Sequence, residues 1–140
     1  MIRSSRPLVL ALTAVAGTLA GCASLPTGCP ASSQPTQWTQ LAFGRSIGDQ
    51  GDLVSEADFQ HFVDSEITPR FPDGLTILDA RGQWRGPDCL LVREPSKILL
   101  LALPSGAESL KKVDEIRAAY RQAFRQDSVM WVTQPACVAF

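Results

Sequence analysis

Hydrophobic positions in the first half of the chain alternate with polar ones, as in a strand, or recur every three to four residues, as in a helix. The segment from Trp38 to Phe43, which carries large apolar residues and stops at Gly44, predicts a short strand. Ser55, followed three residues later by Asp58, has the form of a helix N-cap. This helix is expected to end at Pro69, because proline cannot continue a helix. Its apolar face is formed by Phe59, Phe62, Val63 and Ile67.

The second half of the chain begins with two further strand patterns. Leu75 to Trp84 predicts one strand, and Leu90 to Glu94 together with Lys97 to Leu103 predicts the next. We expect the second strand to be interrupted or bulged at Pro95, because proline lacks the N–H that a sheet ladder uses. The run from Ile98 to Leu101 is too continuously apolar for a solvated edge, which predicts a central strand.

A helix and a last strand complete the pattern. Gly106 to Gln126 is the clearest helix, and Ser128 to Thr133 predicts the final strand. The apolar positions of this helix recur at three- and four-residue spacing and are Leu110, Val113, Ile116, Tyr120, Ala123 and Phe124.

The order of these elements, β-α-β-β-α-β, is that of the α+β ferredoxin-like fold with its split βαβ units. Right-handed crossovers then place both helices on one face of a four-stranded antiparallel sheet. The opposite face must be solvated, or covered by loops or by a partner. It is therefore the expected binding surface.

The amino terminus has the pattern of a secretory signal. Arg3 and Arg6 precede an apolar run from Leu8 to Ala20, which at 13 residues is shorter than the about 20 residues that a membrane-spanning helix needs. The run ends in Leu19-Ala20-Gly21-Cys22, which resembles the lipobox of bacterial lipoproteins. This resemblance implies cleavage before Cys22 and acylation of its thiol, palmitate included. Two or three acyl chains anchor a protein stably where one is marginal.

These signals divide the chain into three parts. We expect a lipoprotein signal peptide over residues 1–21, the lipidated Cys22 and a flexible tether over 22–36, and a single α+β domain over 37–140. The tether is rich in proline, serine and threonine, a composition that does not build a core. Ala23 in place of an aspartate favours, by resemblance to lipoprotein sorting rules, the periplasmic face of the outer membrane.

Charge argues against a nucleic-acid partner. Removal of residues 1–21 takes away two arginines and no acid, which leaves 11 basic and 14 acidic side chains and a formal charge of −3. Nucleic-acid-binding domains instead concentrate basic residues on one surface. The expected partners are the membrane, through the lipid anchor, and an unknown envelope protein or small ligand, with a homodimer as one form of that partnership.

Several segments of the domain resemble an uncharacterised family of small bacterial lipoproteins, catalogued as a domain of unknown function. The most specific of them is the Thr-Pro-Arg-Phe-Pro-Asp-Gly-Leu-Thr segment over residues 68–76, and the resemblance covers nearly the whole mature domain. It implies no activity, because none is known for the family. Cys89 departs from the pattern, since similar sequences tend to have a glycine there. The other matching residues are Phe43-Gly44-Arg45-Ser46, Gly82-Gln83-Trp84, Glu94, Ser96-Lys97, Tyr120, Phe124, Gln126, Ser128 and Val129.

Three cysteines remain once Cys22 is acylated, in a compartment that permits disulfides. In the predicted sheet the last strand runs antiparallel beside the first, so its end approaches the start of the first strand. Cys29 and Cys137 lie just outside those two ends and form the preferred pair. The alternative is that Cys29, Cys89 and Cys137 are all free thiols.

Candidate chemistry is sparse. The sequence has no phosphate loop, dinucleotide fingerprint, nucleophile elbow or zinc-ligand spacing, so we expect no cofactor and no metal. His61 is the only histidine, and its position opposite the apolar face of its helix predicts a solvated side chain. Polar residues at strand ends and turns are the remaining candidates for ligand binding, above all Arg70, Asp73, Gln83 and Glu94, together with Arg45, Ser96 and Gln126.

Two functional hypotheses follow. The first is a non-catalytic envelope module that binds a partner or a small ligand through the free sheet face. The second is an envelope enzyme in which Glu94 acts as acid or base and Arg70 orients an anionic substrate. The second requires both side chains to meet in one cleft. The turn containing Arg70 and Asp73 also has a purely structural interpretation, because aspartate hydrogen-bonds local backbone in turns.

Overall fold

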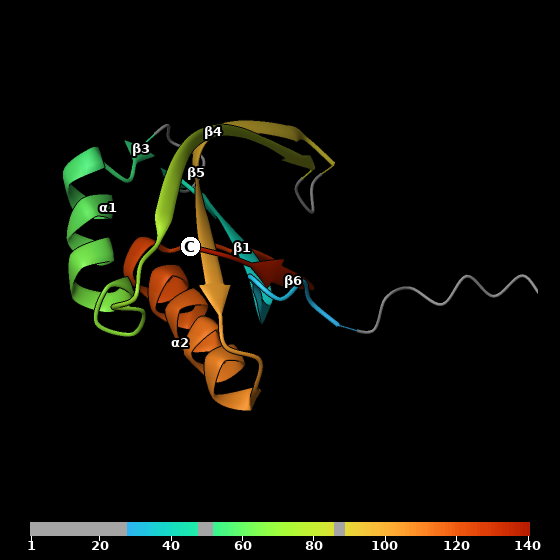
Figure 1. Ribbon diagram of the computed structural model, residues 1–140. Coiled ribbons are helices and arrows are strands. Elements are labelled where there is room, and N and C mark those ends of the chain that lie inside the picture. Colours follow the sequence, from blue (N-terminus) through green and yellow to red (C-terminus); the bar gives the residue numbers. More distant parts are fainter. Residues whose placement is uncertain (1–27, 48–51, 86–88) are drawn as a thin grey trace, which may run out of the picture.

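The domain is built on one four-stranded antiparallel sheet. The structure is a computed structural model and describes residues 28–47, 52–85 and 89–140. The predicted signal peptide, Cys22 and the tether up to residue 27 lie outside these ranges. The strands follow the order β4-β5-β1-β6, and both helices lie on the same side of them (Figure 1). The predicted ferredoxin-like α+β fold is confirmed. The strands are β1 (Gln34–Gly44), β4 (Thr76–Arg85), β5 (Leu91–Leu103) and β6 (Met130–Val138).

The first helical segment begins where the sequence predicts. Ser55 is the N-cap of α1 (Glu56–Phe62), and its hydroxyl accepts a hydrogen bond from the Asp58 amide at 3.0 Å. The chain continues without a break into η1 (Val63–Ile67), a π-helical turn that the sequence pattern does not reveal. This wider turn ends two residues before Pro69 and still keeps the predicted apolar face buried.

The second helix, α2 (Ala107–Phe124), lies on the same side of the sheet as α1. It ends at Arg125, whose left-handed backbone conformation closes the last turn. A small hairpin of β2 (Ser46–Ile47) and β3 (Asp52–Leu53) connects the end of β1 to α1.

The core lies between the sheet and the helices. Tyr120 is its centre, with its ring 4.7 Å from that of Phe43, 5.1 Å from that of Phe62 and 4.8 Å from that of Phe124. Edge-to-face packing of this kind stabilises an aromatic cluster beyond simple burial. The buried apolar residues are Leu41, Phe43, Val54, Phe59, Phe62, Val63, Ile67, Phe71, Leu99, Leu101, Leu103, Val113, Ile116, Tyr120 and Val129.

Two strand predictions are wrong. The sequence predicts that the first strand begins at Trp38, whereas β1 already begins at Gln34 and pairs with β6 from there. The strand β5 also runs through Pro95 without interruption. The carbonyl of Pro95 accepts a hydrogen bond from the Arg45 amide, so the proline nitrogen faces the same side. There β1 has ended, and no ladder bond is lost.

The preferred disulfide is present. Cys29 and Cys137 are bonded, with their Cα atoms 5.5 Å apart. The register explains the proximity, because Cys137 pairs with Pro35 near the start of β1. The bond therefore fastens the edge strand β6 to the segment that leads into the domain. Cys89 is a free, exposed thiol.

Candidate functional site

The sheet face that turns away from the helices is almost free of charge. Strand residues alternate between the two faces, and the register assigns every second residue to this side, which we call the outer face. Among these described strand positions only Glu94 is ionisable. The outer face consists of Gln34, Thr36, Trp38, Gln40, Ala42, Gly44, Thr76, Leu78, Ala80, Gly82, Trp84, Val92, Glu94, Ser96, Ile98, Leu100, Ala102, Met130, Val132, Gln134, Ala136 and Val138.

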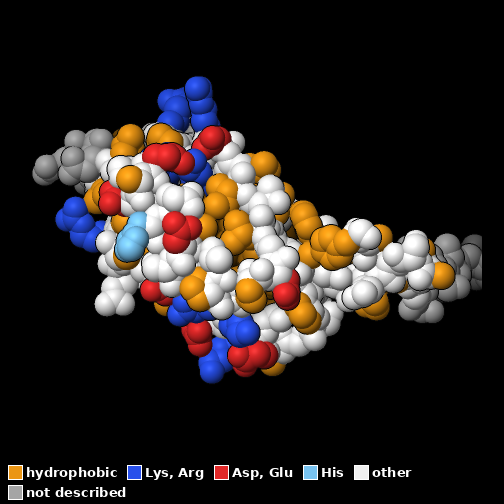
Figure 2. Space-filling model, turned by 60° about the vertical axis from the view of Figure 1, so that its left-hand side comes forward, with side chains coloured by type: hydrophobic (Ala, Val, Ile, Leu, Met, Phe, Trp, Pro, Cys, Tyr) orange, Lys and Arg blue, Asp and Glu red, His pale blue; other side chains and the backbone are white. Residues whose placement is uncertain are grey.

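Large apolar side chains are exposed at the edges of the outer face. Leu78 on β4 is 47% exposed, and Met130 and Val132 on β6 are 59% and 44% exposed. Figure 2 shows the opposite side of the molecule, which carries α1, and there charged side chains are distributed among the hydrophobic ones. Large apolar side chains exposed on one face of a small domain are typical of an interaction site.

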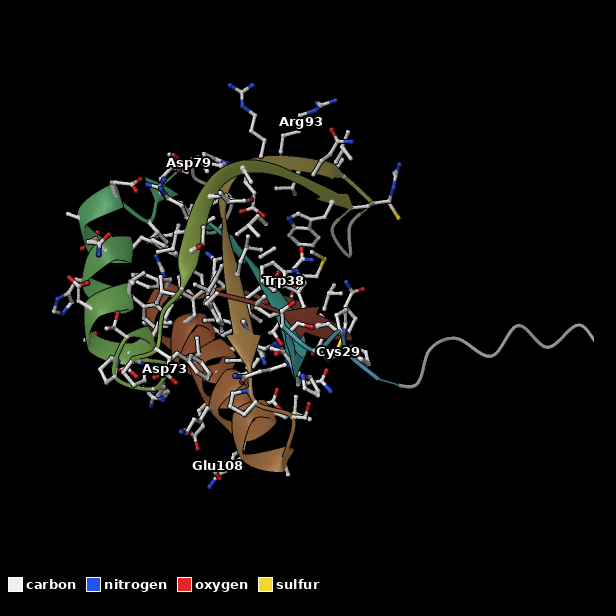
Figure 3. All side chains as sticks on the ribbon, in the orientation of Figure 1. Cys29, Trp38, Asp73, Asp79, Arg93 and Glu108 are labelled. Carbon is white, nitrogen blue, oxygen red and sulfur yellow. A yellow bond between two sulfur atoms is a disulfide. The ribbon has the colours of Figure 1, made fainter. Side chains whose placement is uncertain are left out.

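A cleft opens at one end of the outer face. It encloses about 750 Å³ and includes the outer-face residues Trp38, Leu100 and Ala102 in its lining. Asp73, one of the predicted ligand-binding residues, stands at its rim on the turn before β4, on the opposite side from Trp38 (Figure 3). Its size is within the range of small-molecule sites. The turn that contains Asp73 therefore borders the outer face.

Glu94 is held by two neutral donors. Its Oε2 accepts a hydrogen bond from the Ser46 amide at 3.0 Å, and its Oε1 accepts one from the Trp84 indole at 3.1 Å. The carboxylate lies directly over Gly44, where a Cβ atom would be only 2.6 Å from its oxygens. Glycine is thus required at position 44 for Glu94 to lie there. The only ionisable group of the outer face is occupied by contacts within the chain.

Tyr120 on α2 and Gln126, just after this helix, bind the end of β1 from the helix side. The Tyr120 hydroxyl donates to the Gly44 carbonyl at 2.8 Å, and the Gln126 amide donates to the Ser46 carbonyl at 2.5 Å. Burial raises the pKa of Tyr120 well above its ordinary value, so this phenol stays protonated as a donor. With Glu94, these contacts fix the end of β1 from both faces. The sequence nominated Glu94 and Gln126 separately and gave no signal that they share one segment.

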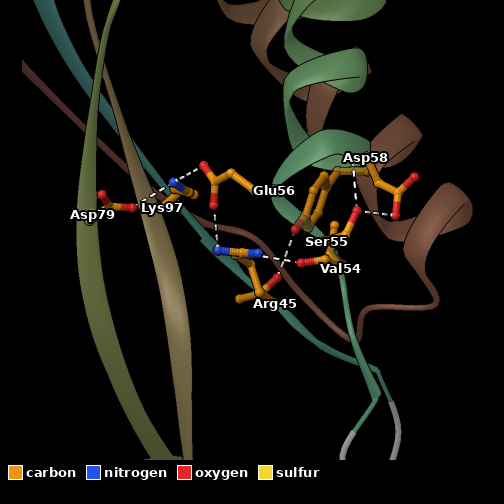
Figure 4. Close-up of polar contacts among 9 residues, drawn as sticks. Arg45, Val54, Ser55, Glu56, Asp58, Asp79 and Lys97 are labelled. Carbon is orange, nitrogen blue, oxygen red and sulfur yellow. Dashed lines mark hydrogen bonds and ion pairs between the residues drawn. The ribbon is translucent and has the colours of Figure 1, made fainter.

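On the helix side of the sheet, Lys97 of β5 is buried and forms ion pairs with two carboxylates (Figure 4). The Lys97 side chain is 6% exposed, and its ammonium donates to Asp79 Oδ1 at 2.5 Å and to Glu56 Oε1. The same ammonium lies 5.8 Å from the centre of the Phe59 ring. Arg45 contacts the second oxygen of Glu56 at 2.9 Å. These four charged residues, which we call the Lys97 clamp, join β4 and β5 to the start of α1.

The charged groups of the Lys97 clamp are paired with one another. The hydrogen bonds that Lys97 donates to Asp79 and Glu56 raise the pKa of Lys97, and the one to Asp79 lowers the pKa of Asp79. The positive and negative charges balance, so the clamp offers no free cation to a ligand. Lys97 is not among the candidate site residues predicted from the sequence. Its signal is a lysine in phase with the inward-facing Leu99, Leu101 and Leu103.

The structure does not bring Arg70 and Glu94 together. Arg70 donates to the Glu66 carbonyl at 2.6 Å and pairs with the carboxylates of Glu66 and Glu115 in the helix layer. Glu94 is bound on the sheet, so the predicted enzyme site is not assembled. Arg70 instead ties the end of η1 to α2.

The other candidates are separate surface groups. Gln83 accepts a hydrogen bond from Arg93 at 3.0 Å across β4 and β5. His61 is exposed on α1, as predicted from its helical position. Ser96 is 7% exposed on the outer face between β4 and β1, beside Gly82. Within the part of the chain that the structure describes, no three histidine, cysteine or acidic side chains are grouped so as to hold a metal ion.

Comparison with known proteins gives a family and a fold. The model of the family described as "Protein of unknown function (DUF3574)" matches residues 38–140, and no curated protein matches the sequence. Two solved structures share the fold at low identity. One is a phage SAM lyase in complex with S-methyl-5'-thioadenosine, with a TM-score of 0.60 and 16% identity over 84% of this chain and 97% of that one. The other is a phage SAM lyase in the apo state, with a TM-score of 0.58 and 17% identity over 76% of this chain and 90% of that one.

Proposed function

We propose that this chain, which belongs to the DUF3574 family of proteins of unknown function, is a non-catalytic binding module. It is held at the cell envelope by a lipid anchor and binds its partner through the outer face. The anchor is the acylated Cys22, and the domain stands on the periplasmic face of the outer membrane. The lipobox pattern supports this location. No helix within residues 28–47, 52–85 and 89–140 is long and apolar enough to cross a bilayer.

The observation that carries the proposal is the contrast in charge between the two sides of the sheet. Lys97 and Asp79 are paired on the helix side, whereas the outer face holds Glu94 as its only ionisable residue among the described strands. Where one face of a small antiparallel sheet is solvated, the strand residues that point to that face are ordinarily polar. An uncharged face with exposed Leu78, Met130 and Val132 is instead the composition of an interface core.

The enzyme hypothesis has less support. Arg70 is paired within the helix layer, and both oxygens of Glu94 accept hydrogen bonds from the chain itself. A general acid or base needs a free path to substrate. The phage SAM lyases share only the fold at this level of identity, and fold alone carries no reaction.

Thiol protection tests the proposal on the full chain in bacterial envelopes. Val132→Cys reports on the outer face, and Gln122→Cys on the exposed side of α2 is the matched control, both in a Cys89→Ser background. We expect the thiol at position 132 to react with a hydrophilic maleimide more slowly in envelopes than in dilute purified protein. The thiol at position 122 reacts equally in both. Equal rates at position 132 would contradict the proposed use of the face.

A separate variant tests the anchor. In Cys22→Ser the acceptor thiol is lost, so we expect the chain to leave the detergent-soluble membrane fraction and to lose metabolic labelling by palmitate. A wild-type chain that carries an intact leader in mass spectrometry would contradict the anchor and leave the outer face untouched as a binding surface.

A further inference from the structure

The occupant of the outer face can be specified from the register of the sheet. We propose that it is a second copy of this chain, packed sheet against sheet about a two-fold axis that runs roughly parallel to β1. This inference rests on the proposed use of the outer face for binding. Three independent features support it: the scarcity of charge, the match of large and small residues across the axis, and the position of the tether.

Charge permits the face to meet its own copy. An isologous interface brings each patch against the same patch, so any charge on it is buried in both copies and needs a partner of opposite sign within that patch. The outer face avoids this, because Glu94 alone is ionisable there and both of its oxygens accept hydrogen bonds from Ser46 and Trp84. The charged side chains of β4 and β5, such as Asp79, Arg81, Arg93 and Lys97, lie at positions of the opposite parity.

The rows of the sheet match under this symmetry. A two-fold axis parallel to the strands keeps each row at its height and reverses its order, so β4 of one copy faces β6 of the other and β5 faces β1. One row reads Leu78, Ile98, Ala42 and Met130 across the sheet. The exposed Leu78 of one copy then meets the exposed Met130 of the other, and the bulky Ile98 meets Ala42.

A second row repeats this match. Ala102 of β5 pairs with Trp38 of β1, so across the axis each small side chain faces a large one. Large residues opposite small ones are how two layers interdigitate to native density. The row between brings Leu100 opposite Gln40 and Thr76 opposite Val132. An axis perpendicular to the strands would instead place β4 against β4 and β6 against β6.

The tether favours the same axis. The described chain begins at Gly28, next to Cys29 and the start of β1, so the segment leading to Cys22 leaves from that end of the sheet. Two copies anchored in one membrane must direct these ends the same way. An axis parallel to β1 does this, and anchoring also raises the effective concentration of each copy for the other.

Oxidative cross-linking tests the pairing on full chains in bacterial envelopes. Two differently tagged chains are co-expressed in a Cys89→Ser background, one with Leu78→Cys and the other with Met130→Cys. Both positions are exposed, so folding is retained, and a formed Cys29–Cys137 bond verifies it. We expect a disulfide-linked dimer from the mixed pair and none from either variant alone. Gln122→Cys on α2 gives no dimer.

The other outcomes are decisive as well. Dimers from each variant alone, or from Gln122→Cys, would overturn the proposed axis. Without a mixed dimer, protection of Val132→Cys in envelopes would mean that another protein or the lipid surface covers the face. That result overturns the second copy and leaves the proposed function standing. No dimer and no protection would remove both.

Discussion

The two faces of the sheet differ in how far this chain buries their apolar side chains and pairs their charges. On the helix side, Phe43, Leu41 and Leu99 are fully buried under α1 and α2, and the Lys97 clamp pairs the charges at the margin. On the outer face, residues one position away along the same strands are uncharged, and several are exposed. The helix side is completed within the chain, and the outer face is not. Its hydrophobic positions contribute little to the core of a single copy, and the proposed binding role accounts for them.

Neighbouring leucines on β5 give the sharpest test of this difference. Leu99 is fully buried on the helix side, and Leu100 lies half-buried on the outer face. We expect Leu99→Ala to lower the free energy of unfolding by about 2–5 kcal/mol, the usual cost of a large cavity in a packed core. Leu100→Ala should cost much less in dilute protein. Chemical denaturation of both variants measures the two values, and equal losses would contradict the contrast between the faces.

The end of β1 tests the point where the two faces meet. A Cβ on Gly44 would lie 2.6 Å from the Glu94 carboxylate, which must then leave its two donors. Gly44→Ala is expected to cost about 1–3 kcal/mol, the range for overpacking a closed site. Glu94→Ala in the same chain should recover part of that loss, because it removes the clash. A double-mutant cycle measured by denaturation reports the coupling, and strictly additive effects would show that the clash is not the cause.

Local signals were sufficient for the fold. The cap at Ser55, the apolar helical face of α2 and the run from Ile98 to Leu101 are short-range patterns, and they predicted the element order correctly. The order then predicted that Cys29 and Cys137 meet. Strand ends were underestimated, because residues such as Gln34 and Gln134 join the sheet through their backbone and carry no hydrophobic signal.

The candidate site was harder to predict because it depends on register. Whether Lys97 meets Asp79, or Glu94 lies over Gly44, follows from which residues pair across β1, β4 and β5. A shift of one residue would move each of them to the other face. The sequence therefore identified polar residues one at a time and wrongly grouped Glu94 with Arg70. The scarcity of charge on the outer face becomes visible only once the register is known.

The pH dependence of the Lys97 clamp is the smallest expected effect. The pKa of Asp79 is lowered from its ordinary 3.8 by the hydrogen bond from Lys97, so its contribution is present above that pH and is lost as pH falls through the folded value. The pKa of Lys97 is raised from 10.5 by Asp79 and Glu56, so its contribution is complete below 10.5 and is lost as pH rises through the folded value. The free energy of unfolding of the wild type should therefore exceed that of Lys97→Met by a constant amount near neutral pH. This difference should shrink toward both extremes of pH.

Lys97→Met is the informative variant because it leaves no charge stranded. The carboxylates of Asp79 and Glu56 are exposed and regain water when the ammonium is removed, whereas the methionine side chain can occupy the same space beside Phe59. Replacing a paired buried cation by an apolar residue of similar volume often changes stability little. A difference in the free energy of unfolding that stays unchanged from acid to alkali in denaturation curves would show that Lys97 acts through packing. The helix side would then rely on hydrophobic contact even at its charged margin.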